Sequence, residues 1–247
     1  KVLGAPGFRY FIDNFGIAET FIFHGLLYFL VMLIAVNYLK KPEEESKEKL
    51  DIKTWLSELK GIIRLPKIWT YWIIFYLNIT AGLAIISNEN LFFTEAGLDF
   101  RMIGWAMGLA AAFNTLGRLC VGWWSDFFTN RSKLFGLLLL FAVISCTLGY
   151  SLPIIIPFIV LLCNAEYGAM FSIMPSTLHD KYGMENISKI HGFVLSAWAF
   201  AGLTGNQVAA WVLNLPGTSH RTVILGVCIL YSIGLYLSTK IWNDKIY

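Results

Sequence analysis

The strongest constraint in this sequence is its series of long apolar stretches. An α-helix needs roughly 20 apolar residues to cross the hydrocarbon core of a bilayer. Segments of that kind lie at about 15–39, 68–93, 103–124, 134–152, 154–174, 190–213 and 223–241. The strands of a membrane β-barrel are shorter and alternate between apolar and polar residues. These segments are longer and do not alternate. The sequence therefore predicts an all-α, multi-pass integral membrane protein with seven spans.

The composition agrees with that class and argues against others. Charged residues make up only 14% of the chain and hydrophobic residues 57%, whereas soluble domains carry about 25% charged residues. The net charge of +3 is too small to indicate a nucleic-acid partner. We find no nucleophile–base pair, no metal-ligand spacing and no phosphate-binding loop in the sequence. An enzyme activity, a cofactor and a metal are therefore not predicted.

The distribution of Lys and Arg among the loops predicts the orientation, because cytoplasmic loops carry an excess of these residues. One set of loops holds Lys40, Lys41, Lys47, Lys49, Lys53, Lys60, Arg64, Arg131, Lys133, Lys181, Lys189, Lys240 and Lys245. The opposite set holds only Lys1, Arg9, Arg101 and Arg221. We expect the amino end outside and the carboxyl end inside, in a plasma or an organelle membrane.

One long polar connection, residues 40–66, separates the first span from the rest. It begins with the mixed-charge run KKPEEESKEK, which is typical of a solvated linker. The following stretch, LDIKTWLSELKGIIRL, places its apolar residues on one helical face. This pattern predicts either an amphipathic helix on the membrane surface or a short, packed connector helix.

The most specific motif is GRLCVGWWSDFFTNRSK, between the third and fourth predicted spans. Gly122 and Asp126 lie four residues apart on one helix face, and Arg131 follows across a tight turn. A glycine allows close helix approach, and a carboxylate at a helix end accepts hydrogen bonds and pairs with cations. These three residues are predicted to form a latch that holds one conformation of the protein.

This loop resembles the signature loop of the major facilitator superfamily, in which Gly-x-x-x-Asp precedes basic residues, although Phe127 replaces the first of these. The family's second, weaker copy joins spans eight and nine, so the resemblance implies spans six to twelve of twelve. The expected fold is a C-terminal six-helix bundle (67–247) with one preceding helix (1–39) and a central cytoplasmic loop (40–66). Its partner would be the missing N-terminal half, and the start at Lys1 instead of Met favours a fragment or a processed chain.

Within that superfamily, the sequence is similar to the oxalate/formate antiporter family, which is monocarboxylate transporter-like. Four stretches carry the resemblance: FYLNITAGLAIIS (75–87), NTLGRLCVGWWSD (114–126), AMFSIMPSTLHDKYG (169–183) and HGFVLSAWAFAGLTGNQVAA (191–210). The resemblance implies a secondary transporter that works by alternating access on a small organic anion. The anion would be exchanged for another anion or moved together with H⁺.

Arg118 is the leading candidate for substrate binding. It lies in the middle of a span, where a charge is costly unless it faces a polar cavity or a partner. Its planar guanidinium matches the geometry of a carboxylate. The resemblance implies that an arginine at this position binds a substrate carboxylate. The alternative is an arginine that is permanently paired with an acid or that caps a helix.

Trp198 marks a departure from the family pattern, which has a lysine there as a second cation. A dianion needs that second cation more than a monoanion does, so the tryptophan favours a monocarboxylate such as formate, lactate or pyruvate. Trp198 either shapes an apolar cavity around the substrate or packs against lipid or another helix. Further substrate-binding candidates are Tyr71, Asn78 and Asn114, residue types that also serve as hydrogen-bonding contacts between helices.

Glu166 is a second charge within a span, the fifth. It is predicted to pair with Arg118 in the empty state, to take up a proton during transport, or to be an interface acid hydrogen-bonded to backbone or to Tyr167.

Two other functions fit parts of this pattern. A seven-helix membrane receptor has the same topology, but the latch motif and the long loop after the first span argue against it. No Asp/Glu-Arg-Tyr-type run ends the third span, and no extracellular cysteine pair is present. A major facilitator transporter for a different substrate class is the other alternative.

Overall fold

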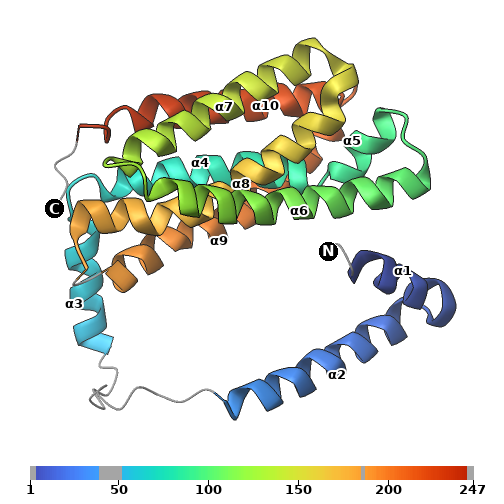
Figure 1. Ribbon diagram of the computed structural model, residues 1–247, viewed down its shortest axis with the longest axis horizontal. Helices are drawn as coiled ribbons and strands as arrows, with labels where there is room; N and C mark the ends of the chain where they lie inside the picture. The colour runs from blue at the N-terminus through green and yellow to red at the C-terminus, as the bar shows by residue number, and fades with distance from the viewer. Residues whose placement is uncertain (1–3, 39–51, 185–186, 244–247) are drawn as a thin grey trace. The chain divides into compact units, whose positions relative to one another are not determined.

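The structure is a computed structural model that describes residues 4–38, 52–184 and 187–243, and Figure 1 shows its helices. Every regular element within these residues is helical. The chain divides into two compact units, Lys1–Gly61 and Ile62–Tyr247. The predicted all-α architecture is therefore confirmed for the described part of the chain.

The first unit contains α1 (Gly4–Phe15) and α2 (Ile17–Val36). Gly16 joins them with φ of 92°, a conformation that glycine adopts without steric cost. The ring of Phe11 stacks on the ring of Phe23, with centroids 5.0 Å apart. Most side chains of α2 are large, apolar and exposed within this unit. Such a helix requires lipid or another protein surface around it.

The amphipathic stretch after the linker forms α3 (Ile52–Ile63). Ile62, near its end, packs against the hydrophobic core of the second unit, while Leu56 is exposed. Most of the charged linker that precedes α3 lies outside the described residues. The choice between a surface helix and a packed connector stays a prediction.

The second unit is a bundle of long helices. Its elements are α4 (Ile68–Ile86), α5 (Glu89–Glu95), α6 (Phe100–Ser125), α7 (Arg131–Ser151), the 3₁₀ turn η1 (Pro153–Ile155), α8 (Ile156–Tyr182), α9 (Ile187–Leu213) and α10 (His220–Ser238).

The prediction of one continuous span over 68–93 is wrong, because the chain breaks between α4 and α5. The Asn88 side chain donates a hydrogen bond to the carbonyl of Ala84 (2.9 Å), which competes with continuation of the helix. Glu89 then begins α5 as a buried residue and accepts a hydrogen bond from Asn164 Nδ2 (3.3 Å). Glu89, which follows the break, therefore forms a polar contact with α8.

Within the described ranges, five helices are apolar and long enough to cross a membrane: α2, α4, α7, α8 and α10. The helices α6 and α9, with 26 and 27 residues, also lie at predicted spans but are less apolar. The polar residues Asn114 and Arg118 lie within the apolar sequence of α6, and His191 and Asn206 lie within that of α9. Polar residues within membrane helices usually face a bundle interior or a cavity, so α6 and α9 are the helices expected to carry a polar site.

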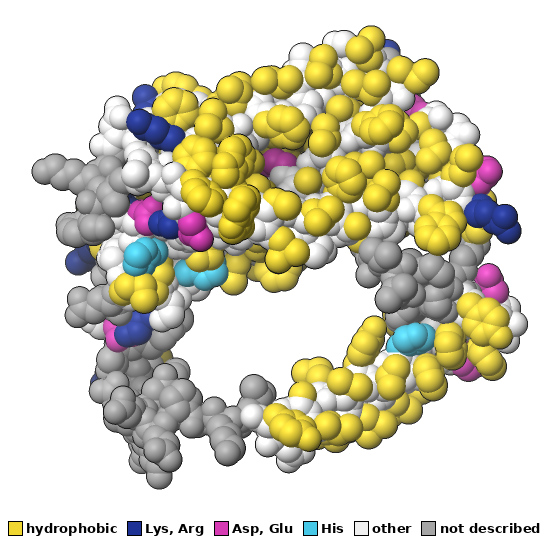
Figure 2. All heavy atoms as spheres, viewed as in Figure 1, with side chains coloured by type: hydrophobic (Ala, Val, Ile, Leu, Met, Phe, Trp, Pro, Cys, Tyr) yellow, Lys and Arg dark blue, Asp and Glu magenta, His cyan; other side chains and the backbone are white. Residues whose placement is uncertain are grey.

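The bundle packs its helices in pairs, α6 along α8 and α4 along α9, with α10 against α4 and α7 (Figure 1). The visible face of this unit is largely hydrophobic, and most of its charged side chains lie toward the ends of the helices, with an acidic side chain visible near the middle (Figure 2). That distribution fits a bundle surrounded by lipid.

Two glycines set the closest approach in the bundle. A Cβ added at Gly117 of α6 would overlap the backbone carbonyl of Ala165, and one at Gly168 of α8 would overlap that of Asn114. The backbones of α6 and α8 therefore touch directly, as small residues permit in membrane helix pairs. One turn further, a Cβ at Gly122 would lie 2.7 Å from Ser172 Oγ.

We expect Gly117→Ala to lower the free energy of unfolding by about 1–3 kcal/mol, because backbone atoms must separate to admit the methyl group. Gly104→Ala, on the same helix, is the matched control, since nothing lies within 4 Å of its added Cβ. The control is expected to keep or raise stability, because alanine favours helix by up to about 1 kcal/mol. Thermal unfolding of the purified full-length protein in detergent, followed by circular dichroism, measures both. Equal midpoints for the two variants would contradict the close contact.

Candidate functional site

Arg118 lies on the exposed side of α6, directly after Gly117. Its Nε atom lies 3.4 Å from Asn114 Oδ1, one turn earlier on the helix. Its guanidinium carbon lies 4.9 Å from the ring centroid of Phe171 on α8, within the range of a cation–π interaction. Among the described residues, no carboxylate forms an ion pair with it. The guanidinium therefore has hydrogen-bonding capacity left for an anion.

Phe171 is the centre of an aromatic cluster that the sequence analysis did not find. Its ring meets the rings of Tyr167 and Trp198 at centroid distances of 5.2 and 5.8 Å. The centroid of the Phe75 ring on α4 also lies 5.3 Å from that of Phe171. Trp198 stands edge-on to Phe171 and is 49% exposed. Two of the predicted site residues, Arg118 and Trp198, thus contact the Phe171 ring, and a third, Asn114, is joined to it through Arg118.

A sequence signal for Phe171 did exist. Tyr167 and Phe171 lie four residues apart in one span, so they share a helix face. The stretch that contains Phe171 was also one of those that carry the family resemblance.

Glu166 does not pair with Arg118 in this structure. It is 3% exposed and its carboxylate accepts hydrogen bonds from Asn78 Nδ2 of α4 and from the Tyr231 hydroxyl of α10 (3.0 Å). The predicted tyrosine partner, Tyr167, is replaced by Tyr231. Sequence separation explains the difference, because Tyr231 reaches Glu166 only after α8 and α10 pack into one bundle.

Two of the predicted substrate-binding residues present almost no surface in this structure. Asn78 is 1% exposed and donates a hydrogen bond to Glu166. Tyr71 is also 1% exposed, and its ring lies 6.0 Å from that of Tyr182 near the end of α8. Neither is among the residues described above around Phe171, and their part in substrate binding stays a prediction.

The predicted latch lies where α6, α7 and α8 meet. Arg131 Nη2 is 3.2 Å from Asp126 Oδ1, which ends α6. Arg131 Nη1 is 2.6 Å from Asp180 Oδ1, near the end of α8. Asp126 is 73% exposed and Asp180 only 15%. Asp180 is not among the latch residues predicted from the sequence, yet its more buried and shorter contact is the stronger of the two.

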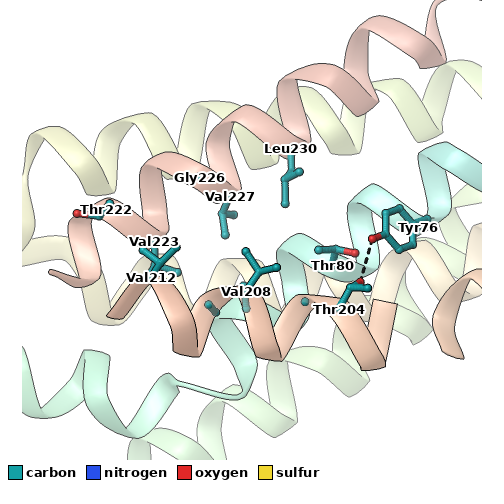
Figure 3. Close-up of a pocket in the computed structure, with 13 residues that line it drawn as sticks. Tyr76, Thr80, Thr204, Val208, Val212, Thr222, Val223, Gly226, Val227 and Leu230 are labelled. Carbon is teal, nitrogen blue, oxygen red and sulfur yellow. Dashed lines mark hydrogen bonds between the residues drawn. The ribbon is translucent and has the colours of Figure 1, made fainter. Parts of the chain in front are cut away.

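A separate cavity of about 310 Å³ lies between α4, α9 and α10 (Figure 3). Valine and other small side chains line most of it, and the hydrogen-bonded pair Tyr76 and Thr204 lies at one end. None of its lining residues belongs to the cluster around Phe171. The cavity is therefore distinct from the Arg118 site.

Among the described residues, no group of three or more His, Cys, Asp or Glu side chains is arranged to hold a metal ion.

These features describe a multi-pass helical membrane protein with an exposed arginine set in an aromatic cluster. The family model of the Major Facilitator Superfamily matches residues 1–206, and the chain belongs to that family.

Two curated relatives add detail. The chain is 24% identical over 230 residues to an oxalate:formate antiporter from Oxalobacter formigenes, covering 89% of this chain and 54% of the relative. It is 28% identical over 212 residues to apicoplast pyruvate carrier 1 from Toxoplasma gondii, covering 78% of this chain and 37% of the relative. The chain thus spans about half the length, or less, of these relatives.

We expect Asp180→Asn to loosen the latch more than Asp126→Asn. Losing the partly buried partner costs about 1.5–3 kcal/mol, whereas exposed ion pairs contribute less than about 1 kcal/mol. Amide hydrogen exchange across residues 126–131 of the full-length protein reports the difference, with faster exchange in Asp180→Asn. Equal acceleration in both variants would assign the latch to Asp126 and Asp180 alike.

Proposed function

We propose that the full-length protein is a secondary active transporter for small organic anions, and that its substrate is a monocarboxylate such as formate, lactate or pyruvate. One observation carries this proposal: Arg118 exposes its guanidinium beside an aromatic cluster on α6, and no carboxylate among the described residues forms an ion pair with it. In major facilitator proteins, two helical halves rock about a central site near the bilayer midplane. Arg118 would contribute to that site from this half.

The chemistry of the cluster suits a small carboxylate with an apolar end. The guanidinium offers a planar fork that pairs with both carboxylate oxygens. Phe171 holds one face of the guanidinium, and Trp198 stands beside it as an apolar wall. With Trp198 in place of a second cation, the site provides one positive charge, which matches a monoanion. The names of the two relatives, an oxalate:formate antiporter and a pyruvate carrier, support this substrate class.

The alternatives from the sequence rank below this proposal. Family membership favours transport over signalling by a seven-helix receptor. A major facilitator transporter for another substrate class remains the second candidate, and the exposed arginine then predicts an anionic group on that substrate as well.

We expect Arg118→Gln to weaken pyruvate binding strongly while leaving the fold intact, because the side chain is exposed and holds no ion pair in the described structure. Arg118→Lys is also expected to fail, since an ammonium keeps the charge but loses the fork. Loss of charge-assisted hydrogen bonds worth about 1.5–3 kcal/mol corresponds to roughly ten- to hundredfold weaker binding. Isothermal titration of the purified full-length protein measures the affinity, and wild-type affinity in Arg118→Gln would refute the assignment.

The alternative hypothesis, a permanent ion pair between Arg118 and Glu166, predicts that a double variant regains the function lost in the single variant. If Arg118 served only to neutralise Glu166, Arg118→Gln combined with Glu166→Gln would restore the uptake lost in Arg118→Gln. Because Glu166 has Asn78 and Tyr231 as partners instead, we expect no rescue. Uptake of labelled pyruvate by proteoliposomes distinguishes the two cases.

We expect Trp198→Lys to shift selectivity toward dicarboxylates, because it adds a second cation beside Phe171. Oxalate uptake relative to formate should rise by about tenfold, equivalent to about 1.4 kcal/mol. Trp198→Leu is the matched control, since it removes the ring without adding charge. An unchanged ratio in Trp198→Lys would remove Trp198 from the site.

A further inference from the structure

The cavity between α4, α9 and α10 is larger than the packing of a helical bundle requires. Protein interiors contain few voids larger than a water molecule. This cavity measures about 310 Å³, roughly twice the volume of an apolar cavity of about 150 Å³ that binds benzene in another protein. Sites for small molecules begin at about 300 Å³. The space is therefore sufficient for a small organic ligand.

Two glycines on the walls of the cavity have different surroundings. A Cβ added at Gly205 of α9 would lie 3.1 Å from the backbone oxygen of Thr80, so this glycine sets the spacing between α9 and α4. A Cβ added at Gly226 of α10 would meet no atom within 4 Å, although Gly226 lines the cavity. A side chain at Gly226 would have room to extend into the cavity, so this glycine keeps the space open.

One end of the cavity carries hydrogen-bonding groups that the described structure leaves unused. Thr80 is only 9% exposed, and its Oγ1 atom has no hydrogen-bond partner among the described residues. Thr204 Oγ1 donates a hydrogen bond to the carbonyl of Phe200 (2.9 Å), so the Tyr76 hydroxyl is the donor in its 2.9 Å contact with Thr204. The Tyr76 oxygen therefore keeps its capacity to accept a hydrogen bond. Figure 3 shows Thr80 beside this hydrogen-bonded pair.

These walls define the chemistry of the ligand. A buried hydroxyl group without a hydrogen-bond partner is unfavourable, so we expect the ligand to carry a group that can donate and accept at that end. None of the described side chains that line the cavity is charged, and a buried ion would need a partner of opposite charge. Valine and other small side chains form most of the wall and suit a hydrocarbon chain. The complementary molecule is uncharged and apolar, with one hydroxyl group at its end.

The cavity opens on the surface of the bundle, part of the way along its helices. Val208 of α9, which lines it, is 56% exposed, and Gly226 of α10 is also exposed. The helix α10 is long and apolar enough to cross a membrane. An apolar alcohol partitions from water into a bilayer by the hydrophobic effect, so such a ligand reaches the opening from the lipid.

We propose that this cavity binds a small, uncharged amphiphile from the bilayer, with an apolar chain and one hydroxyl group, as in a medium-chain alcohol. Thr80 Oγ1 and the Tyr76 oxygen hold the hydroxyl group, and the valine side chains contact the apolar chain. Because the cavity is separate from the Arg118 site, this inference does not depend on the anion that the protein transports.

The first test is photolabelling of the full-length protein in lipid nanodiscs, with an octanol that carries a diazirine group as the probe. We expect the label on residues that line the cavity, located by mass spectrometry of peptides. Gly226→Leu should reduce this labelling by about tenfold, which corresponds to the loss of about two buried methylene groups of the ligand.

Gly104→Leu on α6 is the matched control, because its added Cβ also meets nothing within 4 Å and it does not line the cavity. It should be labelled at the cavity like wild type. Equal labelling of the cavity in the two variants would overturn the proposal. A label spread evenly over the exposed helices of wild type would also overturn it, because it would show partitioning into lipid without a site.

The second test isolates the hydroxyl group of Thr80. Unlabelled 1-octanol and n-octane compete with the probe at equal mole fractions in the bilayer. The advantage of octanol over octane should fall by about three- to tenfold in Thr80→Val, because this variant keeps the shape of the wall and loses one hydrogen bond to the ligand. The thermal midpoint of the ligand-free variant should be at least that of wild type, since only an unpartnered hydroxyl group is removed. An unchanged ratio would show that the cavity accepts any hydrocarbon chain, and a lower midpoint would show that the hydroxyl group is already satisfied. Either result would overturn the assigned ligand class.

Discussion

The direct contact between α6 and α8 determines where the candidate site residues lie. Gly117 and Gly168 let the two backbones touch, and the residues beside these glycines include the candidates of the proposed site. Arg118 follows Gly117, while Glu166 and Tyr167 precede Gly168. A larger residue at either glycine would push α6 away from α8 and separate the Arg118 guanidinium from the Phe171 ring, which lie 4.9 Å apart.

The permanent charge of Arg118 is the second constraint. A guanidinium stays protonated, so within a membrane span it needs an aromatic face, a polar partner or water. The structure supplies Phe171 and Asn114 but no carboxylate among the described residues. Glu166 lies within the same bundle yet is bonded to Asn78 and Tyr231. Because Arg118 and Glu166 contact different partners, the arginine is available to an external anion. A permanent ion pair between them would prevent that.

The sequence was sufficient for features that depend on neighbours along the chain. Hydropathy located the long helices, and the spacing of Asp126 and Arg131 indicated their contact, now measured at 3.2 Å. Features that join distant segments were missed. Asp180 lies 49 positions from Arg131 in the sequence. Glu166 forms hydrogen bonds with Asn78, 88 positions away, and with Tyr231, 65 positions away. Charge and span position identify such a residue as important, but only helix packing selects its partner. The break after Ile86 was missed because both sides of it are apolar.

Helix α8 joins the proposed binding site to the latch. Glu166, Tyr167 and Phe171 occupy its middle, and Asp180 lies near its end. Pro175 lies between these two groups within the helix. It removes a backbone hydrogen bond there, so the helix bends more easily at this position. The same two helices, α6 and α8, therefore carry Arg118 and Phe171 at one level and Asp126 and Asp180 at another. A movement of one segment of α8 relative to the other at Pro175 would therefore alter the Arg131–Asp180 contact.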